Sequence, residues 1–167
     1  MIAHERQLGY QEGQRGFTLI EILITVAIVA MLASIALPMT QLVVQRGKEQ
    51  ELQSALRQIR GAIDAYKQAA DEGHIARAVG DSGYPRSLRD LAYGVERIDD
   101  AKRPKIYFLR RLPRDPMAED ATLPAEQTWG KRSYTSGPEH PQEGADVFDI
   151  YTLSAGIGLN GIPYREW

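Results

Sequence analysis

An apolar segment of 21 residues near the amino terminus, Phe17 to Leu37, constrains this chain more than any other feature. Apolar side chains occupy 17 of its positions. As a helix the segment would span roughly 31 Å at ~1.5 Å per residue, which matches the ~30 Å hydrocarbon core of a bilayer. It is therefore long enough to cross a membrane once.

The composition of the whole chain excludes several classes of protein. The 167 residues are 43% apolar, carry a formal net charge of −2 and include no cysteine. Without cysteine there is no disulfide framework, no thiolate zinc site and no cysteine nucleophile. A near-neutral charge also argues against a dedicated nucleic-acid binder, which would need a strongly basic face. The residues after Leu37 suffice for one modest domain.

Two conventional interpretations of the apolar segment leave something unexplained. Residues 1–16 are polar and lack periodicity, so they are interpreted as a leader. A secretory signal peptide cut after Ala36 would follow a small-x-small triplet, but its apolar region would exceed the usual length of roughly 7–15 residues. An ordinary single-span anchor fits the flanking Arg15 and Arg46, yet it gives no reason for Glu21 inside the segment.

Glu21 is the anomaly of this segment. A charge at the bilayer centre costs on the order of 3 kcal/mol, although a glutamate one turn into the segment could be protonated or reach the interface. Alternatively, its carboxylate meets a cation within an assembly. Cleavage between Gly16 and Phe17 would create an α-amino group beside an apolar helix. In an array of staggered identical helices, Glu21 of one subunit could then pair with the Phe17 amine of its neighbour.

At these residues the chain resembles a known superfamily. Arg15-Gly16 followed by Phe17-Thr18-Leu19-Ile20-Glu21 resembles the class III signal of type IV pilins and type II secretion pseudopilins. That signal has a basic residue, a glycine cut by the prepilin peptidase, an N-methylated phenylalanine and a glutamate four positions later. The resemblance implies cleavage after Gly16, N-methylation of Phe17, and an assembly role for Glu21 together with Phe17.

A second helical pattern follows Pro38. Its apolar positions recur every three or four residues between polar ones, and they are Leu52, Ala55, Leu56, Ile59, Ala62, Ile63, Tyr66 and Ala69. This spacing predicts an amphipathic helix with one buried stripe. Gly73 is the expected C-cap. We predict one gently bent helix of about 55 residues, longer than the globular norm. The resemblance suggests partial unwinding between Pro38 and Gly47 in a filament.

The predicted fold is α+β, with a long N-terminal spine helix, transmembrane and then amphipathic, packed on a small antiparallel C-terminal β-sheet. The expected divisions are a cleaved leader 1–16, a transmembrane or filament-core helix 17–37, the amphipathic half of the spine 38–72, a variable α/β loop region 73–130 and a sheet region 131–167. A short helix is predicted from Ser87 to Tyr93, with Ser87 as cap and Asp90 in its first turn. Strands are predicted at Lys131–Ser136, Val147–Ser154 and Gly161–Trp167.

Short motifs along the C-terminal part narrow the resemblance to the major pseudopilin of type II secretion. They are Tyr84-Pro85 with Leu88, Leu112-Pro113-Arg114-Asp115-Pro116, Trp129-Gly130 with Tyr134, Asp149-Ile150-Tyr151-Thr152-Leu153, and the terminal Trp167. Each is weak alone, but their order matches that family. An apparent insertion, Met117 to Thr128, separates two elements that are normally adjacent.

The resemblance implies a structural subunit that polymerises into a type II secretion pseudopilus and drives protein export. Its partners would be further copies of itself, other pseudopilins or pilins, the prepilin peptidase and an inner-membrane assembly platform. The chain would cross the bacterial inner membrane once, with its C-terminal domain in the periplasm, before assembly into a periplasmic pseudopilus. Two alternatives remain open: a major or minor subunit of a type IV pilus, and a membrane-anchored periplasmic binding module.

The same family usually binds calcium in its final loop, through carbonyls and aspartates around an "LGADG" stretch and a later "DI". Here Gly156 occupies the position of the first aspartate, and the chain ends without the second. Calcium prefers about six to eight oxygen ligands, so the loss of both carboxylates should weaken such a site severely. We predict no comparable calcium site, and no other metal or cofactor.

No catalytic constellation is evident. His74 and His140 stand apart in turn-rich segments and are interpreted as solvated loop residues. The chain shows no glycine-rich phosphate loop and no nucleophile elbow. Enzymatic activity is not expected.

The charges of the C-terminal part are segregated. Residues 102–114 include six basic residues and no acid, whereas residues 139–149 include four acids and neither lysine nor arginine. The two runs are either solvated faces or complementary surfaces that set the register between subunits, with Arg110 and Arg111 opposite Asp146 and Asp149. DNA binding to the basic run is a weaker alternative, and a nucleic-acid partner is not expected.

Overall fold

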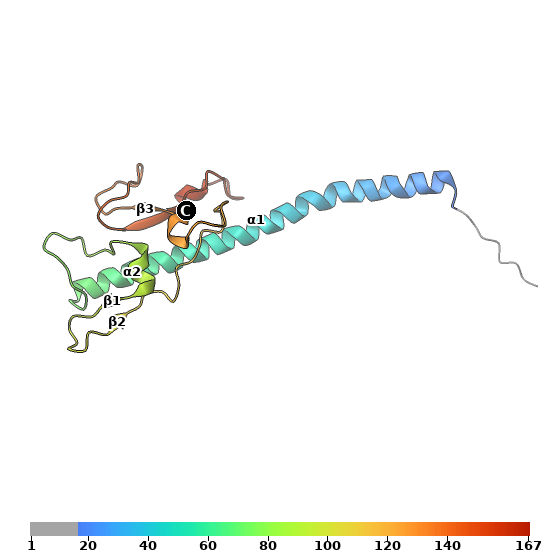
Figure 1. Ribbon diagram of the computed structural model, residues 1–167. Coiled ribbons are helices and arrows are strands. Elements are labelled where there is room, and N and C mark those ends of the chain that lie inside the picture. The colour runs from blue at the N-terminus through green and yellow to red at the C-terminus, as the bar shows by residue number, and fades with distance from the viewer. Residues whose placement is uncertain (1–16) are drawn as a thin grey trace, which may run out of the picture. The chain divides into compact units, whose positions relative to one another are not determined.

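The computed structural model describes residues 17–167, with the backbone alone at 35–38. The predicted leader, including Gly16, lies outside the described residues. In chain order the elements are α1 (Leu19–Asp71), α2 (Leu88–Tyr93), β1 (Val95–Glu96), β2 (Lys105–Ile106), η1 (Ala125–Thr128), β3 (Trp129–Arg132), β4 (Asp149–Thr152) and η2 (Tyr164–Glu166) (Figure 1). The chain divides between Leu42 and Val43 into two compact units, each described below by itself.

The predicted long helix is confirmed. Helix α1 runs for 53 residues, from Leu19 to Asp71, and the backbone between Pro38 and Gly47 is helical. At its C-terminal end Gly73 has a φ of 77°, a conformation that favours glycine. The Gly73 N–H donates to the Ala70 carbonyl at 3.2 Å and the His74 N–H to the Ala69 carbonyl at 2.9 Å. This is a Schellman cap, so Gly73 ends the helix as predicted.

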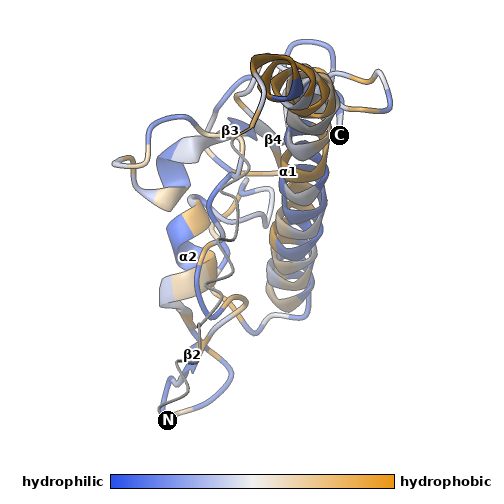
Figure 2. Ribbon diagram, turned by 90° about the vertical axis from the view of Figure 1, so that its right-hand side faces the viewer, coloured by the Kyte–Doolittle hydropathy of each residue, from blue (hydrophilic) through white to orange (hydrophobic). Residues whose placement is uncertain are grey.

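The second unit, Val43 to Trp167, has its core along the amphipathic part of α1. All eight predicted stripe positions are buried, and Leu52 and Ile59 are fully so. The stripe packs with apolar residues from the rest of the unit, namely Ile75, Leu88, Leu91, Trp129, Val147, Ile150 and Tyr164. In Figure 2 polar and apolar residues alternate along these turns of α1, as expected of a helix with one buried face.

Helix α2 confirms the predicted short helix to within one residue. Its N-cap is Ser87, whose backbone N–H donates to the Asp90 carboxylate at 3.0 Å. Leu88 and Leu91 are buried, and Gly94 follows the helix with a φ of 77°. Asp90, at the third helical position, therefore satisfies the N–H of the cap residue Ser87.

Two small antiparallel sheets form, whereas the sequence predicted one. Strands β1 and β2 pair Val95 with Ile106 inside the region that was expected to be loop-rich. Strands β3 and β4 pair Trp129 with Thr152 and Arg132 with Asp149. Both pairs have only two strands, so the unit depends on packing against α1 for its stability.

The predicted strand boundaries need correction. Strand β3 begins two residues before the expected Lys131 and ends at Arg132, because Ser136 donates its N–H to the Ser133 carbonyl at 3.0 Å and so turns the chain. Strand β4 is four residues long and lies within the predicted range 147–154.

The third predicted strand, Gly161 to Trp167, is wrong. Pro163 has no N–H to give a ladder and makes only an isolated bridge with Ile157. The chain then forms the 3-10 turn η2, in which the Glu166 N–H donates to the Pro163 carbonyl at 3.0 Å.

Gly130 explains the tryptophan–glycine motif in the middle of β3. A Cβ at this position would lie 2.4 Å from the ring of Tyr151 on the paired strand. Because no side chain fits that space, Tyr151 can cover the sheet only where its partner is glycine.

Candidate functional site

Two of the predicted processing and assembly residues, Phe17 and Glu21, lie at the start of the described chain. Helix α1 begins at Leu19, and the Glu21 backbone N–H donates to Thr18 Oγ1 at 3.3 Å. Thr18 is thus the N-cap, and Glu21 occupies the third helical position, where a carboxylate interacts favourably with the helix dipole. This second role of Glu21 was not expected, although the Thr-x-x-Glu spacing in the sequence signals it.

Phe17 and Glu21 lie one turn apart at the same exposed helix end. The Phe17 side chain is 79% exposed, and Glu21 is exposed as well. Within residues 17–167 the Glu21 carboxylate makes no ion pair. Its charge is therefore free to meet a group from another molecule, and its pairing with a neighbour's Phe17 amine stays a prediction.

The apolar part of α1 is uncovered. Its most apolar 18-residue window has a mean hydropathy of 2.6, and none of that window is buried. Side chains such as Leu23, Val29 and Leu32 are more than 60% exposed. By length and composition this is the one helix in the described chain that could cross a membrane. A segment so apolar must be covered by lipid or by other helices.

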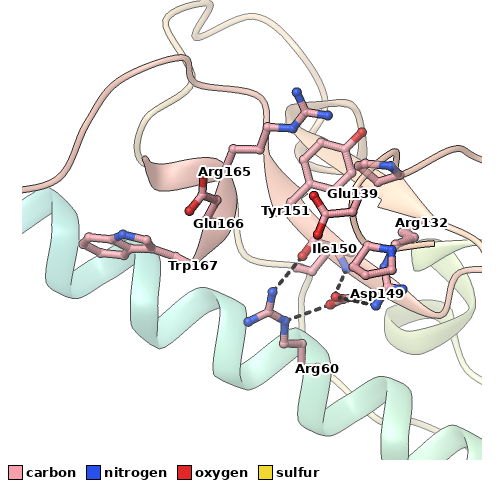
Figure 3. Close-up of a pocket in the computed structure, with 11 residues that line it drawn as sticks. Arg60, Arg132, Glu139, Asp149, Ile150, Tyr151, Arg165, Glu166 and Trp167 are labelled. Atoms are coloured by element: carbon pink, nitrogen blue, oxygen red, sulfur yellow. Dashed lines mark hydrogen bonds and ion pairs between the residues drawn. The ribbon is translucent and has the colours of Figure 1, made fainter. Parts of the chain in front are cut away.

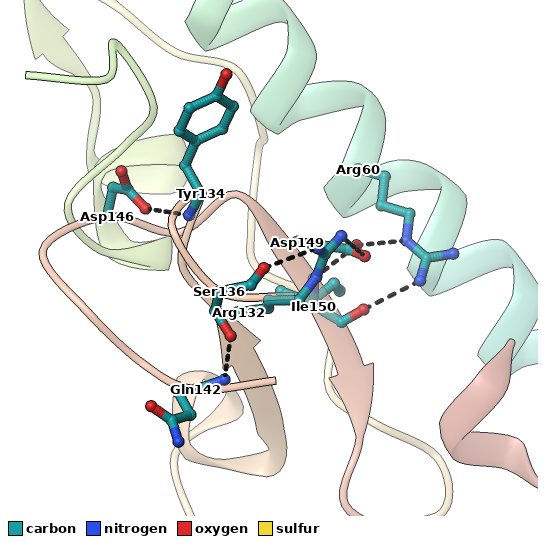
Figure 4. A network of polar contacts seen from close by, with 8 residues as sticks. All are labelled: Arg60, Arg132, Tyr134, Ser136, Gln142, Asp146, Asp149 and Ile150. Atoms are coloured by element: carbon teal, nitrogen blue, oxygen red, sulfur yellow. Dashed lines mark hydrogen bonds and ion pairs between the residues drawn. The ribbon is translucent and has the colours of Figure 1, made fainter. Parts of the chain in front are cut away.

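In the second unit, Asp149 joins three elements of the structure (Figures 3 and 4). Its Oδ1 accepts from Arg60 Nε at 2.8 Å and its Oδ2 accepts from Arg132 Nη2 at 3.2 Å. Arg60 Nη2 also donates to the Ile150 carbonyl at 3.1 Å. These groups line a cavity of about 550 Å³, which Arg165 and Glu166 border too. Asp149 therefore ties strand β4 to helix α1 and to strand β3.

Asp146 is also engaged within the chain. Its Oδ1 accepts from Ser133 Oγ at 2.9 Å and from the Tyr134 N–H at 2.8 Å, as Figure 4 shows for Tyr134. The hydroxyl of Ser82 donates to its other oxygen. Arg110 and Arg111 differ, because both are exposed and neither makes a hydrogen bond or ion pair with the described residues.

The structure therefore does not bring the four predicted interface charges together. The two arginines face solvent, while the carboxylates of Asp146 and Asp149 have partners inside their own unit. Of the acidic run, Glu139 and Glu143 are the exposed members. Complementarity between subunits stays a prediction. Glu143 contacts Lys131 at 3.4 Å, so Glu139 is the one acid of this run without a partner among the described residues.

A buried carboxylate, Asp115, was not expected to have a role. It is 1% exposed, and its Oδ2 accepts from Thr152 Oγ1 at 2.5 Å. Its backbone N–H donates to Thr128 Oγ1 at 3.1 Å, and Trp129 Nε1 donates to the Pro113 carbonyl at 2.9 Å. The insertion 117–128 therefore leaves the two motifs that it separates in contact. The sequence signal for a structural role was the position of Asp115 in the stretch Pro113-Arg114-Asp115-Pro116.

His74 needs a correction, since it is not an isolated loop residue. It is half-buried, with Nδ1 2.8 Å from an Asp99 oxygen and Nε2 3.2 Å from a Glu72 oxygen. Hydrogen bonds from Arg97 and, more weakly, from His74 hold the pKa of the Asp99 carboxyl well below its usual range. The cluster fastens the end of α1 to the segment that follows β1.

An uncovered apolar helix follows a glycine–phenylalanine junction and includes a lone glutamate one turn from its start. Together these features define a membrane-anchored, pilin-like class of protein. Residues 13–37 match the family described as "Prokaryotic N-terminal methylation motif". No solved structure matches the chain significantly.

Curated relatives narrow the class. The chain is 28% identical to the type II secretion system core protein G of Klebsiella pneumoniae over 84% of its own length and 96% of that protein. It is 31% identical to the protein of the same name from Escherichia coli strain K12, over 66% of this chain and 71% of that one. The type IV major fimbrial protein FimA of Dichelobacter nodosus is 39% identical over 46% of this chain and 52% of its own. The chain belongs to the family of type II secretion system core protein G and is a pseudopilin.

Proposed function

We propose that this pseudopilin is a structural subunit that polymerises into the pseudopilus of a type II secretion system and so takes part in protein export. One observation carries the proposal: the methylation motif is followed directly by an apolar helix that no part of the described chain, residues 17–167, covers. Such a helix suits a subunit that is first stored in a membrane and then packed among identical helices. No catalytic activity is expected of it.

The maturation steps follow from the same residues. Cleavage after Gly16 frees the α-amino group of Phe17, which is then N-methylated. The mature chain crosses the inner membrane once, with its second unit in the periplasm. Its partners are the prepilin peptidase, the inner-membrane assembly platform, other pseudopilins and further copies of itself.

Glu21 supplies the selectivity of docking. In lipid an unpaired carboxylate costs on the order of 3 kcal/mol, so a neighbour that brings a cation to it is favoured over one that does not. The Phe17 amine of an adjacent subunit, shifted along the filament axis, is such a cation. The Glu21 charge thereby fixes the register between neighbouring helices whose other side chains in this segment are mostly apolar.

A type IV pilus subunit is the second candidate, and the similarity to the FimA protein favours it. That similarity covers about half of either chain, whereas the similarity to the Klebsiella pneumoniae core protein G covers 84% of this chain and 96% of that protein. The genes beside this one separate the two candidates. A secretion ATPase and an outer-membrane secretin indicate a pseudopilus, and a retraction ATPase indicates a pilus.

The proposal is tested with three variants expressed beside their assembly machinery, with filaments recovered by shearing. Glu21→Ala and Glu21→Gln should both be processed normally and both fail to enter filaments. Thr18→Ala is the matched control, because it removes the helix cap on Glu21 and keeps the charge. Unchanged assembly of Glu21→Gln would refute the pairing.

A further inference from the structure

The last loop of the chain, residues 153–163, connects β4 to η2 and includes no aspartate or glutamate. Its own hydrogen bonds are all local. The Gly158 N–H donates to the Ile162 carbonyl at 2.9 Å, the Gly161 N–H to the Gly158 carbonyl at 2.8 Å and the Tyr164 N–H to the Gly156 carbonyl at 3.0 Å. The Gly156 N–H donates to Ser154 Oγ at 3.3 Å and the Ile162 N–H to Asn160 Oδ1 at 3.0 Å. The exposed side chains of Leu153 and Ile157 add nothing to its packing. These local bonds shape the loop, but a bond to another element is needed to anchor it to the rest of the unit.

That anchor is a carboxylate on helix α1. Glu49 Oε1 accepts from the Leu159 N–H at 2.9 Å, from the Tyr164 hydroxyl at 2.8 Å and from Gln45 Nε2 at 3.2 Å. Gln45 Nε2 also lies 2.9 Å from the Tyr164 hydroxyl oxygen and 3.5 Å from the Ile157 carbonyl. One helical turn thus contacts the middle of the loop and the turn that follows it.

Two aromatic rings pack against the loop: that of Tyr164 in η2 and that of Trp167, which follows η2. Tyr164 is 5% exposed, and its ring meets that of Trp167 edge-on with centroids 5.1 Å apart. Trp167 lies beside α1 in Figure 3. Burial first, and then the hydrogen bond to Glu49, raise the pKa of Tyr164, so its hydroxyl stays a donor at physiological pH. Glu49 and Tyr164 together form a clasp between helix and loop.

Two glycines of the loop fit against these rings. A Cβ at Gly156 would lie 3.0 Å from the Tyr164 ring, and a Cβ at Gly158 would lie 2.5 Å from the Trp167 ring. Gly156 is the position at which the resemblance to the major pseudopilin leads one to expect a calcium-binding aspartate. A side chain there would crowd the tyrosine on which the clasp depends.

The polarity of the site is also wrong for a cation. Calcium needs about six to eight oxygen acceptors around it. The carboxylate beside this loop is surrounded by an N–H, an O–H and an NH₂ group, which are all donors. Among residues 17–167 no group of three or more histidines, aspartates or glutamates could hold a metal ion. The calcium that the family implies therefore does not fit the residues present.

We propose that the Glu49–Tyr164 clasp holds the C-terminal loop of this pseudopilin to its spine helix in place of a calcium ion. The loop is then ordered from the moment the domain folds, whatever the calcium concentration around it. This inference concerns the folding of the subunit, so it stands or falls separately from the filament in which the subunit assembles.

Hydrogen exchange of the mature chain in detergent tests the clasp at the amide of Leu159. Glu49→Ala removes the acceptor, and roughly 10- to 100-fold faster exchange of that amide is expected, with core amides of α1 unchanged. Tyr164→Phe should give a smaller increase, because it removes one of the three donors. Glu51→Ala is the matched control, since Glu51 lies on the same helix, is exposed and makes no hydrogen bond within the described chain. Equal exchange in Glu49→Ala and Glu51→Ala would overturn the clasp.

Calcium itself is the second probe. Thermal unfolding of the wild-type chain should be the same in millimolar calcium chloride as in a chelator, and so should the exchange of Leu159. A ligand that binds only the folded state raises its melting temperature, so an upward shift in calcium would contradict the proposal.

Discussion

Arg60 of helix α1 donates from Nε to the Asp149 carboxylate of strand β4 at 2.8 Å, and so connects the spine to a sheet 89 positions further along the chain. Arg132 shares the same carboxylate from strand β3. Asp149 begins the aspartate–isoleucine–tyrosine motif, so that motif marks a junction of helix and sheet.

Asp149→Asn should destabilise the second unit, because two guanidinium groups would lose their counter-charge. The side chains of Arg60 and Asp149 are 38% and 27% exposed, so solvent screens the pair and the expected loss is about 1–2 kcal/mol. Thermal unfolding followed by circular dichroism measures it. Glu143→Gln breaks the more exposed 3.4 Å contact with Lys131 and should cost less than about 0.5 kcal/mol. Equal losses of stability in the two variants would show that Asp149 does not connect helix and sheet more strongly than a surface ion pair does.

Gly130→Ala should destabilise the sheet pair by about 1–3 kcal/mol, because the new methyl group would overlap the Tyr151 ring. Gly137→Ala serves as the control, since a Cβ there meets nothing within 4 Å. The melting temperatures of the two variants give the comparison. If the Gly130 variant kept wild-type stability, Tyr151 would not lie where we place it.

Thr152→Val should cost about 1.5–3 kcal/mol, because it leaves the buried Asp115 carboxylate without its hydroxyl donor while side-chain volume is nearly kept. Thr122→Val is a fair comparison, since its hydroxyl bonds the exposed Asp120 instead. Chemical denaturation midpoints distinguish them. No difference between the variants would argue against a stabilising hydrogen bond from Thr152 to Asp115 in the core.

Stability should fall in acid through the cluster at Asp99. The folded-state pKa of this carboxyl lies below its unfolded value, so the unfolded chain binds more protons and stability rises with pH across that window. The contribution is present above about pH 4 and is lost as the pH falls below it. Asp99→Asn should flatten the acid limb of the unfolding curve relative to wild type. An unchanged acid limb in Asp99→Asn would show that Asp99 does not contribute to the pH dependence of stability.

Local patterns predicted the helices well, because their signals lie within a few residues. The three- and four-residue spacing from Leu52 to Ala69 identifies the buried face of α1. Ser87 marks the start of α2, and Gly73 marks the end of α1. The third strand failed for a physical reason that the sequence does show: Pro163 cannot donate to a ladder.

Long-range partners could not be predicted in the same way. Nothing near Asp149 in the sequence indicates Arg60, and nothing near Tyr164 indicates Glu49, 115 positions before it. Asp146 and Asp149 looked like a charged surface because their hydroxyl, amide and guanidinium partners come from distant segments. The Thr18–Glu21 cap could have been predicted from its spacing, but Glu21 was interpreted only as an assembly residue.

Mass spectrometry of the amino-terminal peptide of the protein, purified from its own host membranes, tests the central claim most directly. We predict a mature chain that begins at Phe17 with one methyl group on its α-nitrogen, and no peptide that spans Gly16 and Phe17. A mature chain that keeps residues 1–16, or one that begins after Ala36, would contradict it.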